Sequence, residues 1–255
     1  MPDAVPGRLS HGQLLELRRW NTPTIFNGWE QVTTRDTTRE CFNLEETRDF
    51  MPDQGSMVGR AITLVIEPSN RAHAKGDGEA WAKYYRYMAH APGPKVVVVQ
   101  DLDKPRTHGS FWGEISSNLH RALGCVGTIV DGGVRDVEEM RHAGFRAIAR
   151  RRCVGHAAMW PVRWGCEVEV FGCKVGPGQL IHADAHGFVA IPEEDEPRLV
   201  EAAAFMDRNE CHTMIESARS AEGLAPDEVL ARFEEAARAF GEAARARFRR
   251  GGEWG

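Results

Sequence analysis

Four consecutive valines, Val96–Val99, constrain the fold of this 255-residue sequence more than any other feature. They lie within residues 95–101, a segment of strand length in which the apolar run leaves neither face of a sheet polar. A strand that is apolar on both faces is typical of a parallel sheet covered on both sides. Residues 57–67 are also apolar and β-branched, and they predict a second buried strand. We therefore expect an α/β or α+β fold with a mixed sheet at its core.

Helical and strand patterns alternate along the rest of the chain, without repeats. Residues 35–56 are polar and predict a long loop or short helices, whereas residues 166–192 contain short strands separated by turns, as in antiparallel hairpins. In residues 112–123 the apolar side chains Ile115 and Leu119 share one helical face. Further strands are expected over 125–130 and 145–149, and helices over 10–20, 24–32, 77–89, 112–123, 134–143, 197–219 and 226–250.

This pattern predicts three regions: a helical N-terminal extension (1–55), a central domain (56–220) and a C-terminal amphipathic helix (221–255). The last helix carries an apolar stripe that includes Phe233, Phe240 and Phe248. It could pack on its own domain or contact another subunit. Both alternatives stay open at this point, although we expect an oligomer contact.

Composition excludes several classes of protein. With 32 Lys and Arg against 37 Asp and Glu, the net charge is −5, so we expect no nucleic-acid partner and no anionic membrane partner. The longest apolar run is far shorter than the roughly 20 residues of a membrane helix. The first residues lack a signal-peptide pattern, and we expect a cytoplasmic protein. The six cysteines form no C-x-x-C pair and predict reduced thiols without an assigned role, and His182 and His186 lie in a segment that does not favour a zinc site.

The most informative local segment is Asp131-Gly132-Gly133-Val134-Arg135-Asp136. It follows a predicted strand and precedes a predicted helix, where ligands of α/β proteins commonly bind. Its glycines would let a ligand approach the backbone closely, and Arg135 offers a planar fork for a carboxylate. Alternatively, Asp136 only caps the following helix and Arg135 pairs with it on the surface.

A second segment, Gly113-Glu114, opens the preceding predicted helix. Twenty residues separate Glu114 from Arg135, enough for a helix and a strand that return the chain to the same edge of the sheet. Glu114, Arg135 and Asp136 could therefore converge. Two carboxylates suit Mg²⁺ or Mn²⁺, which prefer oxygen ligands.

These segments resemble the family that includes the regulator of ribonuclease activity A and the class II 4-hydroxy-4-methyl-2-oxoglutarate aldolases. The resemblance covers roughly residues 55–220, and residues 22–27 also resemble the start of many such chains. It rests on Gly113-Glu114, Leu119, Gly124, Gly127, residues 131–136, Gly144-Phe145, residues 175–178, residues 181–184 and residues 187–192.

The resemblance implies an α/β/α-type sandwich assembled as homotrimers or homohexamers. It also implies a lyase that cleaves a 4-hydroxy-2-oxo acid to pyruvate, decarboxylates oxaloacetate, or does both, with Mg²⁺ or Mn²⁺. By the same resemblance, Asp136 is a metal ligand, Glu114 holds a metal-bound water and Arg135 binds the pyruvyl group. The Gly113 segment, with the backbone N–H groups of Ile115, Ser116 and Ser117, would bind the substrate carboxylate. Glu210 is the best match for an acid that reaches the metal through water from a neighbouring subunit.

Two other functions remain open. One is a lyase or hydrolase acting on a larger oxo acid, with residues 35–56 and 150–165 setting its specificity. The other is a non-catalytic regulator that binds a ribonuclease or another protein; that branch lacks the aspartate after the arginine, so Asp136 favours the enzyme. Arg146 stands where many relatives have proline, and Arg150–Arg152, His156 and Trp160 are also particular to this sequence.

Overall fold

The computed structural model describes residues 8–75, 78–248 and 250. They group into two compact units, and each is described by itself below. The sheet unit comprises residues 10–22 and 36–193, and the helical unit comprises residues 23–35 and those from 194 onward. These units cut across the predicted boundaries at residues 55 and 220. Residues 1–7 of the predicted extension and Arg249 of the predicted last helix lie outside the described residues.

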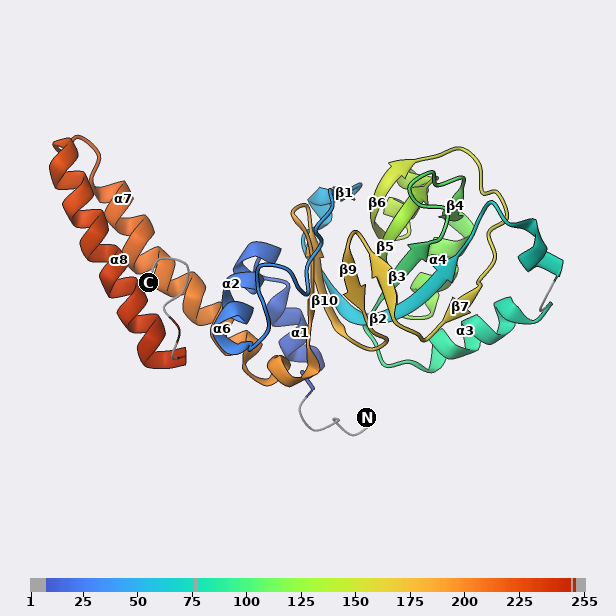
Figure 1. Ribbon diagram of the computed structural model, residues 1–255, viewed down its shortest axis with the longest axis horizontal. Helices are drawn as coiled ribbons and strands as arrows, with labels where there is room; N and C mark the ends of the chain where they lie inside the picture. Colours follow the sequence, from blue (N-terminus) through green and yellow to red (C-terminus); the bar gives the residue numbers. More distant parts are fainter. Residues whose placement is uncertain (1–7, 76–77, 249, 251–255) are drawn as a thin grey trace. The chain divides into compact units, whose positions relative to one another are not determined.

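A nine-stranded mixed sheet forms the centre of the sheet unit (Figure 1). Seven of its strands follow one another in the order β1 (Arg48–Asp49), β6 (Arg146–Arg152), β5 (Cys125–Val134), β3 (Lys95–Asp101), β2 (Met57–Ile66), β10 (Leu180–Asp184) and β11 (Gly187–Ile191). In addition, β4 (Ser110–Trp112) pairs with β5, and β7 (Arg163–Trp164) pairs with β2. The neighbouring strands β2, β3, β5 and β6 run parallel, so their carboxyl ends share one edge, whereas β1, β7, β10 and β11 pair antiparallel.

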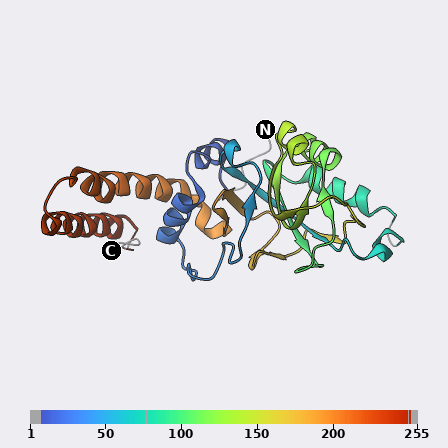
Figure 2. The same cartoon turned by 90° about the horizontal axis from the view of Figure 1, so that it is seen from above.

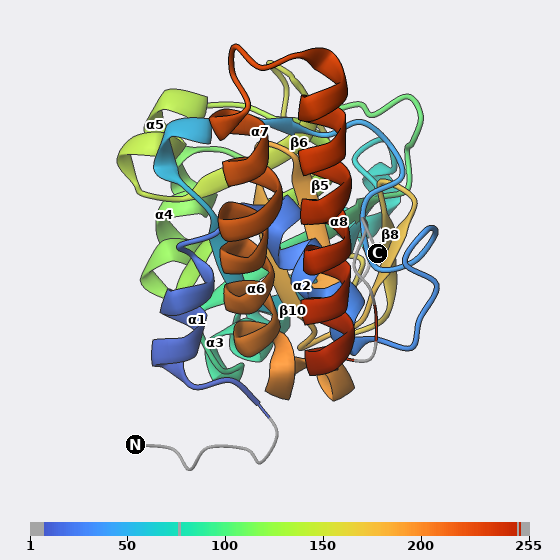
Figure 3. The same cartoon turned by 90° about the vertical axis from the view of Figure 1, so that its left-hand side faces the viewer.

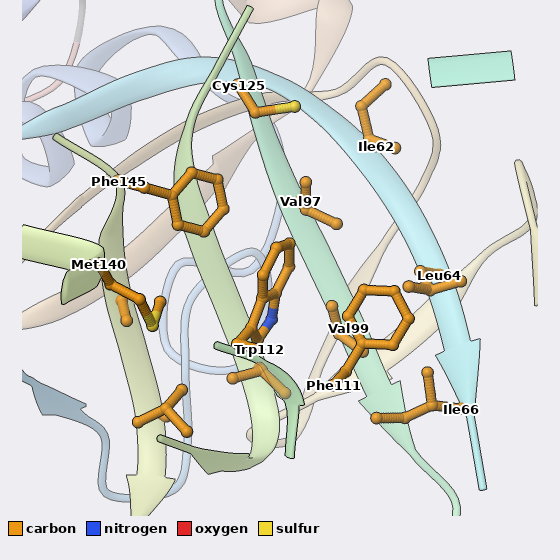
Figure 4. Packing of buried hydrophobic residues seen from close by; sticks show 14 of the residues in the cluster. Ile62, Leu64, Ile66, Val97, Val99, Phe111, Trp112, Cys125, Met140 and Phe145 are labelled. Atoms are coloured by element: carbon orange, nitrogen blue, oxygen red, sulfur yellow. The ribbon is translucent and has the colours of Figure 1, made fainter. Parts of the chain in front are cut away.

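The four valines of β3 serve both faces of this sheet, which confirms the prediction of a strand buried on both sides. Val97 and Val99 belong to one apolar core, and Val96 and Val98 belong to the other. Figure 4 shows the first core, where Trp112 lies between Phe145 and the β3 valines. Helices α3 (Ala80–His90), α4 (Glu114–Ala122) and α5 (Val137–His142) lie on this face, and the ribbon of β8 (Val168–Val170) and β9 (Cys173–Val175) covers the other.

The helix predicted over residues 112–123 begins at Glu114, because residues 110–112 pair with β5 as strand β4. Its apolar residues do share a face, but that face points outward: Ile115 is 86% exposed and Leu119 is 38% exposed. Ser116, Ser117 and His120 face inward instead. The His120 ring contacts Trp112 at 4.6 Å, and burial lowers the pKa of His120 to about 4, so the ring packs as a neutral group.

Strand β5 extends beyond the predicted 125–130 to Val134, so Gly132 and Gly133 lie in the strand and not in a turn. Close approach explains both glycines. A Cβ on Gly132 would lie 2.7 Å from Asp101 Oδ2, and one on Gly133 would lie 2.7 Å from Cys153 Sγ. The chain turns only at Arg135 and Asp136.

The start of the chain is tied to the sheet by His182 and Asp184. Helix α1 (His11–Leu17) begins with a capping box between Ser10 and Gln13, within the predicted helix 10–20. The His182 ring contacts the Leu17 carbonyl at 3.1 Å and the Thr22 hydroxyl at 3.0 Å, and Thr22 N–H donates to Asp184 at 2.7 Å. Burial lowers the pKa of His182 to about 4, so this histidine is a neutral structural group.

The 3₁₀ turns Pro52–Gln54 and Arg71–Lys75 also belong to the sheet unit. Residues 35–56, predicted as a long loop or short helices, contain the first of these turns, strand β1 and an isolated β-bridge between Phe42 and Val189. All six cysteines are free thiols, including Cys166 and Cys173.

The helical unit contains α2 (Thr22–Val32, from its second residue), α6 (Glu196–Glu210), α7 (Glu216–Ser220) and α8 (Pro226–Phe248). The predicted helix 197–219 is interrupted by a π-helical turn at Cys211–Ile215. Helix α8 packs along α6 and α7 as an antiparallel hairpin, with Phe240 and Ala244 against Met206 and Met214 (Figures 2 and 3). The apolar stripe of α8 therefore packs within its own unit. Across the described residues, no helix is long and apolar enough to cross a membrane.

Candidate active site

A pocket of about 400 Å³ opens beside the end of β5, on the helix-covered face of the sheet. Its walls come from α3, from β4 and the start of α4, and from the turn after β5. The three residues predicted to converge all line it: Glu114, Arg135 and Asp136, together with Gly113, Ile115 and Ser116.

Asp136 adopts a left-handed backbone conformation (φ 52°) at the start of α5, but its side chain makes no cap hydrogen bond to that helix. The side-chain cap expected by the alternative is therefore not observed, although the pairing of Asp136 with Arg135 that it also expected is. Its Oδ2 atom instead accepts a hydrogen bond from Glu114 N–H at 3.1 Å, at the start of α4. Arg135 Nε lies 3.7 Å from the same oxygen. A helix N-terminus attracts a carboxylate, so the start of α4 holds the Asp136 side chain at the pocket.

Gly113 makes this arrangement possible. A Cβ at this position would lie 2.8 Å from Asp136 Oδ2 and 3.2 Å from Arg135 Nε. The backbone of Gly113 is extended (φ −172°), so the requirement for glycine comes from this close approach alone.

The first turn of α4 offers two backbone donors to a ligand. Ser117 N–H donates to the Gly113 carbonyl at 3.0 Å, and Ser117 is not among the pocket residues. The N–H groups of Ile115 and Ser116 have no main-chain acceptor among the described residues, as is usual for the first turn of a helix. Of the three predicted backbone donors, these two are placed to bind an anion.

Aromatic side chains form the opposite wall, and none of them was among the predicted site residues. Trp81 and Tyr85, one turn apart on α3, line the pocket with Phe111 and Met159. Trp81 stacks on Phe111 with ring centroids 5.2 Å apart, and Trp160 contacts Trp81 edge-on at 6.0 Å. Burial raises the pKa of Tyr85 to about 12, so its hydroxyl stays protonated. The spacing of Trp81 and Tyr85 puts them on one face of a helix, but nothing in the sequence shows which core that face meets.

Asp131, the first residue of the segment, does not line this pocket. It is fully buried and pairs with Arg150 and Lys104, which both also pair with Glu45. Phe171 N–H donates to Asp131 at 3.1 Å. Arg150 thus belongs to an internal ion-pair cluster.

Arg151 and Arg152 do not line the pocket either. The Arg151 guanidinium donates a hydrogen bond to the Thr107 hydroxyl, and Arg152 Nη2 lies 3.9 Å from Glu138 Oε1. The exposed His156 contacts the Ala157 carbonyl.

Glu210 lies at the end of α6 in the helical unit, where Asn27 Nδ2 donates to it at 3.1 Å. Its assignment to a neighbouring subunit's site stays a prediction.

Metal binding would rest on the two pocket carboxylates. No three His, Cys, Asp or Glu side chains in the described part of the chain gather closely enough to hold a metal ion. A closed protein cage of the zinc type is therefore not formed by those residues. Mg²⁺ is commonly bound by one or two carboxylates together with water and substrate oxygens, and Asp136 and Glu114 fit that pattern.

Comparison with known proteins identifies the family of this chain. A family model described as RraA-like (Aldolase/RraA) matches residues 22–190. The chain belongs to the RraA-like family. This family includes 4-hydroxy-4-methyl-2-oxoglutarate aldolases and ribonuclease inhibitors.

Individual relatives of this RraA-like chain are distant. An uncharacterized protein of Methanocaldococcus jannaschii is 26% identical over 63% of this chain and 72% of its own. A Halalkalibacterium halodurans protein, provisionally named a 4-hydroxy-4-methyl-2-oxoglutarate aldolase, is 26% identical over 63% of this chain and 71% of its own. The crystal structure of Streptomyces coelicolor RraAS2, an unusual member of the ribonuclease ES inhibitor family, matches with a TM-score of 0.64 at 21% identity, over 80% of this chain and 96% of that one. This structural likeness shows the shared fold.

Proposed function

We propose that this RraA-like protein is a divalent-cation-dependent lyase that forms pyruvate, by aldol cleavage of a 4-hydroxy-2-oxo acid, by decarboxylation of oxaloacetate, or by both. The observation that carries the proposal is the convergence of Arg135, Asp136 and Glu114 on one pocket. A guanidinium beside two carboxylates suits a substrate that brings its own carboxylate and keto oxygen.

Each group has a distinct task in this chemistry. Asp136 would hold the cation directly and Glu114 through water, and the cation, when bound, supplies Lewis-acid stabilisation of negative charge. Arg135 donates to the pyruvyl oxygens and adds fixed positive charge beside them. The N–H groups of Ile115 and Ser116 bind the substrate carboxylate.

The two reactions differ in their need for a base. Aldol cleavage requires removal of the proton from the C4 hydroxyl, and Glu114, acting through a water molecule, would accept it. Loss of CO₂ from oxaloacetate leaves the same pyruvate enolate without that proton transfer. One pocket can therefore support both reactions, with Glu210 of a neighbouring subunit as the candidate for a further acid.

The aromatic wall favours a second candidate, a substrate with an apolar or aromatic substituent at C4. Trp81, Phe111 and Met159 offer this end of the substrate an apolar surface, whereas a second carboxylate there would lose hydration. Met159, which lies between β6 and β7 in segment 150–165, lines the pocket, and this supports a role for that segment in specificity. The loop 35–56 contributes no residue to it.

The first test measures pyruvate released from oxaloacetate and from 4-hydroxy-4-methyl-2-oxoglutarate with Mg²⁺ or Mn²⁺. We expect activity that EDTA abolishes and that Asp136→Ala lowers by at least about 100-fold, because the substitution removes the charge that anchors the cation. Arg135→Lys should also be strongly impaired, because an ammonium cannot replace a two-point guanidinium contact. Glu139→Gln, an exposed change on the following helix, serves as the matched control. Turnover that survives EDTA, or full activity of Asp136→Ala, would contradict the mechanism.

A second measurement decides between the substrate classes. The phenyl-substituted substrate 4-hydroxy-2-oxo-4-phenylbutanoate is compared with 4-hydroxy-4-methyl-2-oxoglutarate in wild type and in Trp81→Ala. If the wall receives the substituent, Trp81→Ala lowers kcat/KM for the phenyl substrate by about tenfold or more and changes oxaloacetate turnover little. Equal losses for all substrates would mean that Trp81 only supports the fold.

A further inference from the structure

A second pocket, of about 420 Å³, lies at the opposite edge of the sheet, where the parallel strands begin. Its walls come from helix α1, from the starts of β2, β5 and β6, and from the turn at Gly93-Pro94. It shares no lining residue with the candidate active site.

Arg146 is the unusual residue of this pocket. Its side chain is only 6% exposed. Nη2 donates to Asp49 at 2.6 Å, which balances the buried charge. Nε and Nη1 are buried without a hydrogen-bond partner among the described residues. A buried guanidinium with two unused donors is costly, so a rotation of this side chain that brings a donor to the pocket surface would let a polar ligand satisfy it.

The rest of the pocket is cationic at its rim. The Arg121 side chain makes no hydrogen bond or ion pair with any described residue, and among these residues the Arg18 guanidinium bonds only to the Ser56 carbonyl, from Nε at 3.2 Å. His11 stands beside them, and the lining contains no aspartate or glutamate. A rim that carries basic side chains and no acidic ones favours an anion.

Much of the remaining lining is apolar. It includes Leu14 and Leu15 of α1, together with Met57, Val58 and Val126. A small inorganic anion would leave this surface in contact with water, whereas an apolar body would bury it.

We infer that this pocket binds an organic anion, with a carboxylate or phosphate head at Arg146 and Arg121 and an apolar body against α1 and the strand starts. Arg146 supplies the two buried donors and Arg121 the accessible charge. The inference does not depend on the activity proposed for the other pocket.

The experiment is a calorimetric titration of the whole chain with four probes: octanoate, octyl phosphate, octanol and inorganic phosphate. We expect saturable binding of octanoate or octyl phosphate at one site per chain, at least about tenfold tighter than octanol and than inorganic phosphate, because only the first two offer both head and body. Comparison of the two amphiphiles identifies the preferred head group.

Variants locate the binding. Arg121→Gln, an exposed change, should weaken binding of the preferred probe several-fold, and Arg146→Gln by about tenfold or more. Arg163→Gln, an exposed arginine on β7 away from the pocket, should leave binding unchanged. If Arg146→Gln fails to fold, Arg121→Gln and Arg18→Gln decide the question. Octanol binding as tightly as the anions, the absence of saturable binding, or unchanged affinity in the folded pocket variants would overturn the inference.

Discussion

At the scale of single residues, Asp101 has the carboxyl group whose protonation should matter most for stability. It ends β3, is 1% exposed, and accepts one hydrogen bond, from Asp103 N–H at 3.0 Å. Its Oδ2 atom has no hydrogen-bond partner among the described residues. Burial, with the nearby carboxylates of Asp103 and Asp131, raises the pKa of Asp101 from 3.8 to about 7.

The sign of the resulting pH dependence follows from proton linkage. Between these two pKa values the folded protein binds this proton more tightly than the unfolded chain does. Asp101 therefore contributes stability at low pH that is lost as the pH rises towards 7. The upper limit of this loss is about 4 kcal/mol, since each pKa unit corresponds to about 1.4 kcal/mol.

Asp101→Asn keeps the acceptor for Asp103 N–H and removes the titration. We expect it to raise the free energy of unfolding at pH 8 relative to wild type, and to do so less at pH 5. Urea denaturation at the two pH values measures this difference. Asp227→Asn, at the exposed start of α8, should show the wild-type pH dependence. If Asp101→Asn shows it too, Asp101 is not the titrating group.

At the scale of elements, the start of α4 positions the candidate site. Gly113→Ala would place a methyl group 2.8 Å from Asp136 Oδ2 and so displace the carboxylate and the neighbouring guanidinium. We expect pyruvate formation to fall by about tenfold or more, because a small misplacement of reacting groups is costly. The melting temperature should change little, since both side chains can move towards solvent. Gly155→Ala, where a new Cβ meets nothing within 4 Å, is the control. Unchanged activity of Gly113→Ala would separate this geometry from function.

Elements were predictable where the pattern is local. The segment around the β3 valines was predicted with its correct bounds, 95–101, and the helix predicted from residue 10 begins at His11. The extent of β5 was not predictable, because Gly132 and Gly133 fit a strand only beside Asp101 and Cys153, which belong to other segments. Likewise, the spacing in the sequence predicted that Glu114 and Asp136 lie close together. It could not show that the Asp136 carboxylate accepts from Glu114 N–H at the start of α4 and does not cap α5. Such details depend on contacts between distant residues.

At the scale of the whole molecule, the exposed apolar face of α4 is the feature that the single chain leaves unexplained. Ile115 and Leu119 follow the glutamate of the candidate site and lie largely in contact with solvent. An apolar surface next to a site is typical of an interface, and the family resemblance leads us to expect homotrimers or homohexamers. A subunit covering this face would also bring residues of its own near the pocket. The apolar stripe of α8, by contrast, already packs within the helical unit.

Light scattering tests this expectation. We expect the wild-type mass to be a multiple of the 28.4 kDa chain. Leu119→Glu should shift the distribution towards smaller species, because a charge buried in an interface is costly. Leu230→Glu tests the exposed side of α8, and Leu102→Glu is a matched exposed control. Loss of assembly in Leu119→Glu together with loss of pyruvate formation would connect the interface to the site and support an acid such as Glu210 acting from a neighbouring subunit. A wild-type monomer that is active at low concentration would exclude that role, because every group needed for catalysis would then belong to one chain.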